Sequence, residues 1–256
     1  MRSKKLKLMV GALLVTMVGA TFVGCGSDSS SENNTASSKD STTISISGST
    51  SVGPLMEKIQ EKYEEENNNT TLEIQQNGSG AGIKDVISGI SEIGMSSREL
   101  KDDEKTSVQG TIVAYDGIAL LVNPENPVKN ISLEDVKKIY TGEITNWKEV
   151  GGDDSPIVVI SREEGSGTRD AFQEIVGYES EELLKDATIS DGSGAVKTTV
   201  AGNKNAIGFA SFEYIDNTVA ALNVNDVEPT SDNVKSGDYK ISRPFILVTK
   251  EDSLTE

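Results

Sequence analysis

From Thr43 onward, short runs of β-branched and apolar residues alternate with longer stretches in which apolar residues recur every three or four positions. Runs of the first kind are typical of strands, and stretches of the second kind are typical of amphipathic helices. Their alternation favours an α/β fold with a largely parallel sheet. The expected strands span 44–47, 71–75, 112–122, 157–161, 207–211 and 245–249, and the expected helices begin near Ser51 and span 83–89, 133–140 and 168–176.

The clearest helical pattern follows Ser51. Leu55, Ile59 and Tyr63 are spaced four residues apart, which places them on one face of a helix. Pro54 lies in the first turn of this helix, where proline is tolerated because its missing N–H would have no partner there. We therefore expect an amphipathic helix at this position.

The first 24 residues have a different pattern. Four basic residues within the first seven positions precede a mostly apolar stretch at 8–23. That stretch is shorter than the roughly 20 apolar residues of a membrane-spanning helix, and the order of basic head, apolar run and small residues predicts a signal peptide at 1–24. The FVGC run at 22–25 resembles the bacterial lipobox, although Phe22 stands where that motif prefers leucine. The alternative is an ordinary signal peptide beside a chance cysteine.

The next segment, 25–43, is read as a lipid-bearing Cys25 followed by a flexible tether. Seven serines and almost no apolar residues lie between positions 26 and 43, a composition that cannot pack against a core. We therefore expect an exported lipoprotein that carries diacylglycerol and palmitate on Cys25. It would be held at the extracytoplasmic face of the cell membrane.

Composition narrows the possible functions. A length of 256 residues at roughly 150 per domain allows one large or two modest domains. The formal charge of −17 opposes nucleic-acid binding, because phosphate backbones are repelled by a field of that sign. The absence of histidine excludes Ser-His and Cys-His catalysis and His-containing zinc sites. A single cysteine cannot form an intramolecular disulfide.

Three segments share one local design, in which glycine and hydroxyl residues follow a strand and open a helix. They are SGSTSVGPL at 47–55, NGSGAGIKDV at 77–86 and EGSGTRDAF at 164–172. Helix N-termini present unpaired N–H groups and a partial positive charge, and glycine lets an anion approach the backbone. Each hydroxyl could instead cap its own helix. Three such segments together favour a site for a tetrahedral oxyanion.

Other phosphate-binding and nucleophile motifs do not fit. The chain has no GxxxxGK[ST] loop and no GxSxG elbow, and GSGAG does not complete GxGxxG. The GSGAVKTT run at 192–199 is read as a turn that enters a helix. Arg162 ends a strand three residues before the third glycine loop, where its guanidinium could donate to two oxygens of an anion. Glu164 could orient Arg162, and the alternative for these two residues is a surface ion pair of little consequence.

Several runs in the same order resemble the phosphate-binding proteins of bacterial Pst-type ABC importers. They are the three glycine loops, IGMSSREL at 93–100, AYDGIALLVNP at 114–124 and LEDVKKIYTGEITNWKEVGG at 133–152. The resemblance implies a type II periplasmic-binding-protein fold, in which two α/β lobes joined by two crossing segments close over a ligand. The expected crossings are 120–124 and 206–212. Lobe 1 would then comprise 44–121 plus 207–256, and lobe 2 would comprise 122–206.

The resemblance also implies a ligand site. By motif, the expected phosphate-binding residues are Thr50, Ser51, Ser79, Ser97, Arg162, Ser166, Gly167 and Thr168, with Glu164 as the salt-bridge partner of Arg162. Some relatives carry an aspartate at the position of Ser97, where it accepts the proton of phosphate. Our hypothesis is that Asp116 supplies this acceptor, and the alternative is a solvated turn residue.

The expected function is that of a non-enzymatic receptor without metal or cofactor. It would act as a monomer that captures inorganic phosphate and delivers it to the permease and ATPase subunits of an ABC importer. The alternatives are a receptor for sulfate, molybdate or another tetrahedral oxyanion, and a secreted phosphate-ester hydrolase. A surface adhesin or signalling lipoprotein is a third class, which an aromatic content of 5% does not favour.

Overall fold

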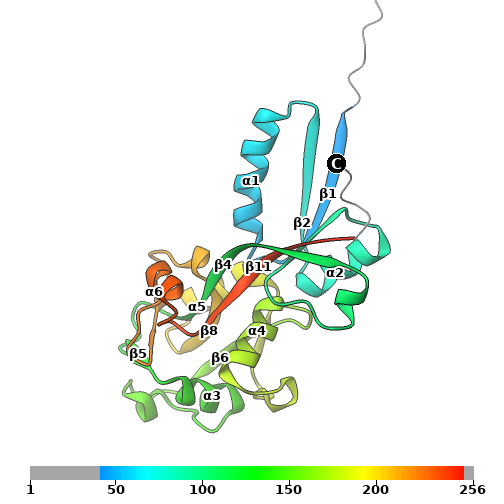
Figure 1. Cartoon of the computed structure of the whole chain (residues 1–256). Helices are drawn as coiled ribbons and strands as arrows, with labels where there is room; N and C mark the ends of the chain where they lie inside the picture. The colour runs from blue at the N-terminus through cyan, green and yellow to red at the C-terminus, as the bar shows by residue number, and fades with distance from the viewer. Residues whose placement is uncertain (1–40, 251–256) are drawn as a thin grey trace, which may run out of the picture. The chain divides into compact units, whose positions relative to one another are not determined.

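The computed structural model describes residues 41–250, so the predicted signal peptide, Cys25 and most of the predicted tether lie outside the described residues. Figure 1 shows the chain. The strands are β1 (Thr42–Gly48), β2 (Thr70–Gln76), β3 (Ile93–Ser96), β4 (Gln109–Val122), β5 (Asn130–Ile131), β6 (Val158–Arg162), β7 (Thr188–Ser190), β8 (Ala206–Ser211), β9 (Ala220–Ala221), β10 (Asn223–Val224) and β11 (Ser242–Thr249). The helices are α1 (Gly53–Glu66), α2 (Ser79–Ser88), α3 (Leu133–Thr141), α4 (Gly167–Val176), α5 (Gly192–Ala201) and α6 (Ser231–Ser236), with short 3-10 turns η1 (Glu104–Thr106), η2 (Trp147–Val150), η3 (Ser180–Glu182) and η4 (Phe212–Tyr214).

Every strand and helix expected from the pattern is present, with ends shifted by a few residues. The pattern did not reveal the short strands β3, β5, β7, β9 and β10 or the short helix α6. The 192–199 run, read as a turn that enters a helix, lies within α5 itself. On α1, Met56 is buried, whereas Ile59 and Tyr63 are 37% and 40% exposed. The spacing therefore located the helix, but the lobe covers only its first turns.

One nine-stranded sheet runs through the described chain in the order β2-β1-β3-β11-β4-β8-β6-β7, with β9 added to β4. β1 is parallel to β2 and β3, and β6 is parallel to β7 and β8. β4 and β11 form an antiparallel pair at the centre of the sheet. The predicted α/β class is confirmed, but the sheet is mixed rather than largely parallel, because β4 and β11 pair antiparallel with their neighbours.

Strand β4 belongs to both halves of this sheet. Its residues 109–117 pair with β11, and its residues 118–122 pair with β8. The chain passes back at Ile241 to Ser242, where β11 begins. We therefore define lobe 1 as residues 42–117 plus 242–249 and lobe 2 as residues 118–241.

This pairing corrects the predicted second crossing at 206–212 and the assignment of 207–256 to lobe 1. β8 pairs with the second half of β4 and with β6, so it stays in lobe 2. The chain returns later because the side chains of Leu222, Tyr239 and Ile241 complete the core of lobe 2. The Tyr239 hydroxyl fixes this return by donating to the carbonyl of Ile118 at 2.9 Å.

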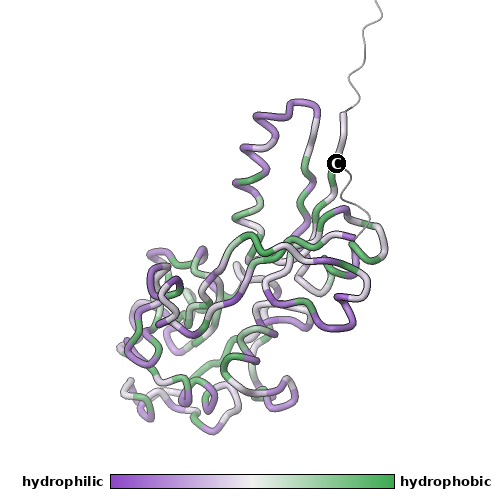
Figure 2. Tube along the Cα trace, in the orientation of Figure 1, coloured by the Kyte–Doolittle hydropathy of each residue, from purple (hydrophilic) through white to green (hydrophobic). Residues whose placement is uncertain are grey.

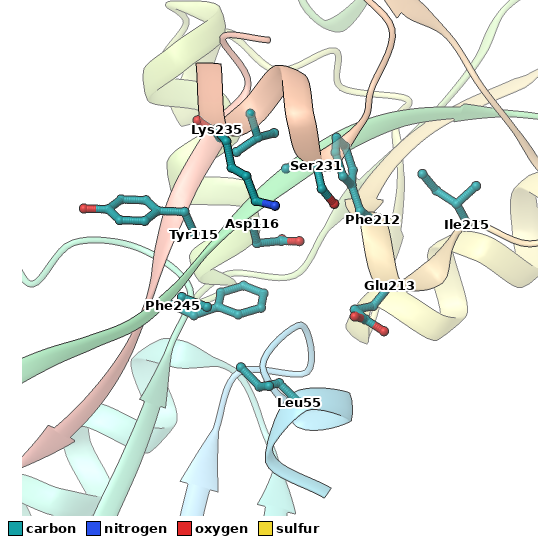
Figure 3. Close-up of a pocket in the computed structure, with 13 residues that line it drawn as sticks. Leu55, Tyr115, Asp116, Phe212, Glu213, Ile215, Ser231, Lys235 and Phe245 are labelled. Carbon is teal, nitrogen blue, oxygen red and sulfur yellow. The ribbon is translucent and has the colours of Figure 1, made fainter. Parts of the chain in front are cut away.

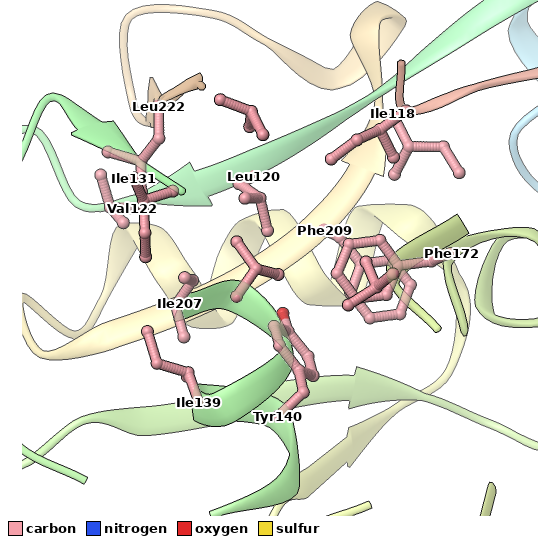
Figure 4. Close-up of a cluster of buried hydrophobic side chains, with 14 of the residues drawn as sticks. Ile118, Leu120, Val122, Ile131, Ile139, Tyr140, Phe172, Ile207, Phe209 and Leu222 are labelled. Atoms are coloured by element: carbon pink, nitrogen blue, oxygen red, sulfur yellow. The ribbon is translucent and has the colours of Figure 1, made fainter. Parts of the chain in front are cut away.

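The core of lobe 2 packs around β4 and β8 (Figure 4). Phe172 of α4 stacks on Phe209 of β8 with ring centroids 4.1 Å apart, and Tyr140 of α3 meets Phe172 edge-on. Burial of such rings is a major source of stability, and their stacking fixes the position of α4. The N-terminus of α4 is thereby held against lobe 1.

Lobe 1 has smaller cores on the two faces of its strands. Figure 2 shows hydrophobic residues gathered along β4 and β11 and a mostly hydrophilic α1. Three apolar side chains of β4 are exposed: Ile112, Val113 and Tyr115, at 46%, 41% and 69%. Within residues 41–250, no helix is long and apolar enough to cross a membrane.

Candidate anion-binding site

Seven hydroxyl side chains gather where the two lobes meet. We call them the hydroxyl cluster: Ser49, Thr50, Ser51, Ser79 and Ser97 of lobe 1, with Thr168 and Ser193 of lobe 2. All are buried except Thr50, which is partly exposed. The N-termini of four helices bring them together, because Ser51 precedes α1, Ser79 opens α2, and Thr168 and Ser193 lie in the first turns of α4 and α5.

Hydrogen bonds within the cluster cross from one lobe to the other. The Ser51 hydroxyl lies 2.8 Å from that of Thr168 and 3.0 Å from that of Ser193. Within lobe 1, Ser49 donates to Ser97 at 2.9 Å, and the Ser97 and Ser79 hydroxyls lie 3.3 Å apart. Hydroxyls can donate and accept, so this arrangement can re-form its bonds around the oxygens of a bound anion.

The helix termini add donors of their own. α1, α2 and α5 have no side-chain N-cap, unlike α4. The N–H of Ser193 points at the Thr50 hydroxyl, 3.2 Å away. Converging N-termini therefore make the surroundings of the cluster favourable to negative charge.

Arg162 lies at the end of β6 with its side chain 1% exposed. Its Nη1 donates to Ser193 Oγ at 3.1 Å, and its Nη2 donates to Thr50 Oγ1 at 3.2 Å. A guanidinium in this position can donate to two oxygens of an anion that reaches the cluster. Arg162 therefore lies where the sequence predicted a cationic member of the site.

The salt-bridge partner of Arg162 is Glu163, which corrects the prediction of Glu164. Nε and Nη2 of Arg162 donate to the two carboxylate oxygens of Glu163 at 2.8 and 2.7 Å. Burial raises the pKa of the Glu163 carboxyl, but the bonds and charge of Arg162 outweigh this and leave the pKa below its ordinary value. Glu164 is exposed and has no ion pair among residues 41–250.

Asp116 is buried, but it does not contact the hydroxyl cluster. Its Oδ2 accepts from Arg243 Nη2 at 2.9 Å, and its Oδ1 accepts from Ser211 at 2.9 Å. Burial raises the pKa of Asp116, and the charge of Arg243 opposes that shift. Asp116 is therefore the partner of Arg243, which corrects both the predicted role of proton acceptor and the alternative of a solvated turn residue.

Of the predicted residues on α4, Thr168 joins the cluster directly. The Ser166 hydroxyl accepts from the N–H of Arg169 at 3.2 Å, so it acts as the N-cap of α4. Gly167 lies so close to lobe 1 that a Cβ at this position would lie 2.3 Å from Ser79 Oγ. The α4 terminus thus forms one wall of the site.

Two residues were missed by sequence reasoning. Ser193 lies in the segment read as a mere turn into a helix, although its Gly-Ser-Gly run has the composition of the other three loops. Arg243 has no local signal beyond a lone charge at the start of an apolar strand. Arg243 Nη1 donates to Thr168 Oγ1 at 2.7 Å and to the carbonyl of Ser97 at 3.1 Å.

Further contacts hold the lobes together around the cluster. Arg98 of lobe 1 pairs with Glu104 of its own lobe at 2.8 Å and with Asp170 of α4 at 3.0 Å. The N–H of Gly80 donates to the carbonyl of Gly165 at 3.0 Å. The described structure is therefore a closed arrangement of the two lobes.

A pocket of about 1030 Å³ lies elsewhere, between α1, β4, α6 and β11 (Figure 3). Its lining is largely apolar and includes Leu55, Tyr115, Phe212 and Phe245, with Asp116 among the polar residues. Its donors, such as Lys235, lie beside the carboxylates of Asp116 and Glu213, whose negative charges oppose a bound anion. We therefore assign the candidate site to the hydroxyl cluster. Residues 41–250 contain no group of three acidic, histidine or cysteine side chains placed to hold a metal ion.

Comparisons with known proteins agree with this geometry. The model of the PBP superfamily domain matches residues 33–255. The phosphate-binding protein PstS of Bacillus subtilis (strain 168) is 35% identical over 249 residues, which cover 94% of this chain and 82% of that protein. PstS of Borreliella burgdorferi is 32% identical over 217 residues, which cover 80% of this chain and 78% of that protein.

Solved structures give the same result. A Clostridium perfringens protein, assigned as a phosphate ABC transporter substrate-binding protein and solved with bound phosphate, is 56% identical with a TM-score of 0.83. The match covers 84% of this chain and 89% of that one. An ABC-type phosphate transport receptor from Vibrio cholerae is 38% identical with a TM-score of 0.69, over 82% and 88% of the two chains. The chain therefore belongs to the PBP superfamily and, within it, to the PstS family of phosphate-binding proteins.

Proposed function

We propose that this chain is the extracytoplasmic receptor of a phosphate ABC importer. It captures inorganic phosphate between its lobes and delivers it to the permease, whose transport the ATPase subunits drive. The observation that carries this proposal is the hydroxyl cluster itself, where seven hydroxyls, four helix N-termini and Arg162 converge between two lobes. Similarity to PstS proteins over nearly the whole chain supports it.

A tetrahedral anion suits this cluster for a physical reason. Its four oxygens need donors from several directions, and the cluster supplies hydroxyls from both lobes. These donors are neutral or belong to neutralised ion pairs, so burying them costs far less than burying several free charges. The closed lobes would shield the anion from water and strengthen each bond to it.

Closure is the proposed mechanism of delivery. Phosphate binds first to the loops of one lobe, and the donors of the other lobe engage when the lobes meet. Contacts such as Arg98 with Asp170 then stabilise the closed form. The permease would recognise that form by the way it aligns the surfaces of the two lobes.

A hydrolase is less well supported by the same residues. Hydrolysis of a phosphate ester needs a nucleophile with a base, or a metal cluster. Glu163 and Asp116, the carboxylates that pair with the two arginines bonded to the cluster, are each already bound to an arginine. We therefore propose a non-enzymatic receptor.

Isothermal titration of the full chain, freed of co-purified anions by dialysis, tests this function. We expect one phosphate per chain with a Kd of about 1 µM or tighter, equivalent to roughly −8 kcal/mol. Sulfate and molybdate in roughly hundredfold excess should not displace phosphate if the site discriminates among tetrahedral oxyanions. Absence of heat with phosphate, together with tight binding of sulfate or molybdate, would assign the chain to another anion.

The proposed location depends on Cys25, which lies outside the described residues. Its support is the apolar run at 8–23, the FVGC run and the serine-rich segment that separates Cys25 from β1. In cells, Cys25→Ser should move the protein from the membrane fraction to the soluble fraction, because a diacylglycerol anchor would be lost. Ser27→Ala is the matched control and should stay in the membrane fraction. Unchanged membrane retention of the Cys25 variant would contradict the lipid anchor.

A further inference from the structure

Arg243 lies at the point where β4 and β11 join the two lobes. In the antiparallel ladder it stands directly opposite Asp116, and its Nη2 donates to Asp116 Oδ2 at 2.9 Å. The Arg243 side chain is 2% exposed and that of Asp116 is 8% exposed. A buried pair of this kind contributes little net stability compared with apolar residues of similar size. Its position beside the cluster therefore suggests a functional use.

The remaining contacts of Arg243 lead to both lobes. Nη1 donates to Thr168 Oγ1 of lobe 2 at 2.7 Å and to the carbonyl of Ser97 of lobe 1 at 3.1 Å. Among residues 41–250, the buried Nε of Arg243 has no hydrogen-bond partner. The guanidinium thus keeps an unused donor while it contacts two residues of the predicted phosphate site.

A continuous series of hydrogen bonds connects Arg243 to Arg162. It runs from Arg243 to Thr168 at 2.7 Å, to Ser51 at 2.8 Å, to Ser193 at 3.0 Å and to Arg162 at 3.1 Å. Three hydroxyls therefore lie between two guanidinium groups. Burial lowers the pKa of Arg243, and the positive charge of Arg162 acts in the same direction. An anion among these hydroxyls would be attracted by both groups.

Each guanidinium is also paired with a carboxylate. Arg162 is held by Glu163 through Nε and Nη2, and Arg243 is held by Asp116 through Nη2. The cationic group of each pair is therefore the one bonded to cluster hydroxyls. A doubly charged anion gains more from two such groups than a singly charged one, because the Coulomb energy scales with its charge.

We propose that Arg243 is a second cationic group of the anion site, positioned by Asp116, and that it favours the dianion of phosphate over the monoanion. This inference rests on the proposed phosphate-binding function. It gives Arg243 of β11 a role in selecting between the two charge states of phosphate, in addition to the donors of the glycine loops. Asp116 acts through Arg243 and is a positioning residue.

The test is the pH dependence of phosphate affinity by isothermal titration, on either side of the second ionisation of phosphate, at about pH 5.5 and about pH 8.5. The main variant is Asp116→Asn with Arg243→Gln, which keeps the net charge of the pair. For the wild type we expect tighter binding at the higher pH. For the double variant we expect a roughly tenfold loss at the higher pH and a much smaller loss at the lower pH.

Two further variants separate ligand selection from folding. Arg243→Lys keeps the charge and should bind more weakly at both pH values while keeping the wild-type ratio of the two affinities. Arg98→Gln removes another buried arginine between the lobes, whose side chain pairs with Glu104 and Asp170 and bonds to no hydroxyl of the cluster, and it should lower both affinities by the same factor. Thermal unfolding of each variant reports its stability independently.

The decisive quantity is the ratio of the phosphate affinity at about pH 8.5 to that at about pH 5.5. If this ratio were the same in the double variant as in the wild type, the role of Arg243 would be overturned and phosphate binding would stand. If the affinity ratio of Arg243→Lys fell to the ratio of the double variant, the role of the Arg243 charge would be overturned as well. If the wild type bound no phosphate at either pH, the proposed function itself would fail. The two failures are therefore distinguishable.

Discussion

Exchange of Arg162 for glutamine should weaken phosphate binding by on the order of a thousandfold, or about 4 kcal/mol. Arg162 is buried and donates to Thr50 and Ser193 within the cluster, so its loss removes the charge that faces the anion. It also leaves Glu163 without its partner at the edge of the site. Isothermal titration of the variant against the wild type measures this loss.

Glu164→Gln is the matched control, since it changes a neighbouring carboxylate that is exposed and bonded to no residue of the cluster. Its affinity should stay within about a factor of two of the wild type, as expected for an exposed charge. Normal binding by the Arg162 variant would contradict the site. A large loss in the Glu164 variant would show instead that the partner first predicted for Arg162 is the one that matters.

Gly167→Ala should lower phosphate affinity by roughly a hundredfold or more without loss of folding stability. The added Cβ would lie 2.3 Å from Ser79 Oγ, 2.8 Å from Ser79 Cβ and 3.0 Å from Ser97 Oγ, all across the boundary between the lobes. The lobes would have to move apart to accommodate it. Isothermal titration measures the affinity, and small-angle X-ray scattering with phosphate should show a more open molecule than the wild type.

Gly194→Ala provides the control for Gly167→Ala. Gly194 also lies in the first turn of a helix beside the cluster, but the nearest atom to its Cβ would be Tyr214 Cε1 at 3.8 Å. This variant should bind phosphate like the wild type. If Gly167→Ala closed fully and kept its affinity, the described closed arrangement would not be the form that holds the anion.

Local pattern was sufficient for most of the elements because each long strand and amphipathic helix carries its own apolar period. The second crossing could not be predicted, because β8 has the same apolar run whether it pairs in lobe 1 or lobe 2. What decides its place is the register of Leu120 opposite Phe209, together with the late return of Tyr239 to Ile118. These contacts join residues that are distant in sequence, and nothing in the local sequence of these residues indicates that they pair.

The site shows the same division between local and long-range information. Ser51, Ser79 and Thr168 could be found because each lies in a glycine loop that opens a helix. Ser193 lies in a similar glycine-rich run, but that run was interpreted only as a turn because it does not complete the GxxxxGK[ST] motif. Arg243 could not be found from its neighbours, because only the β4–β11 ladder brings it beside Asp116 and Thr168.

The acidic composition is compatible with an anion receptor once the charges are located. The formal charge of −17 belongs to the chain as a whole, whereas the hydroxyl cluster lies at helix N-termini and accepts hydrogen bonds from two arginines. Dipoles and guanidinium groups about 3 Å from an anion act well inside the screening length of solution. Bulk charge therefore disfavours polyanions on the surface without preventing capture of a small ion between the lobes.

A crystal structure of the full chain grown with phosphate tests the central claim most directly. We predict one phosphate within the hydroxyl cluster, with oxygens at hydrogen-bond distances of about 2.7–3.2 Å from Arg162 and from hydroxyls of both lobes. Phosphate bound in the apolar pocket beside Tyr115 or elsewhere on the surface, with the bonds among Ser51, Thr168 and Ser193 unchanged, would contradict it.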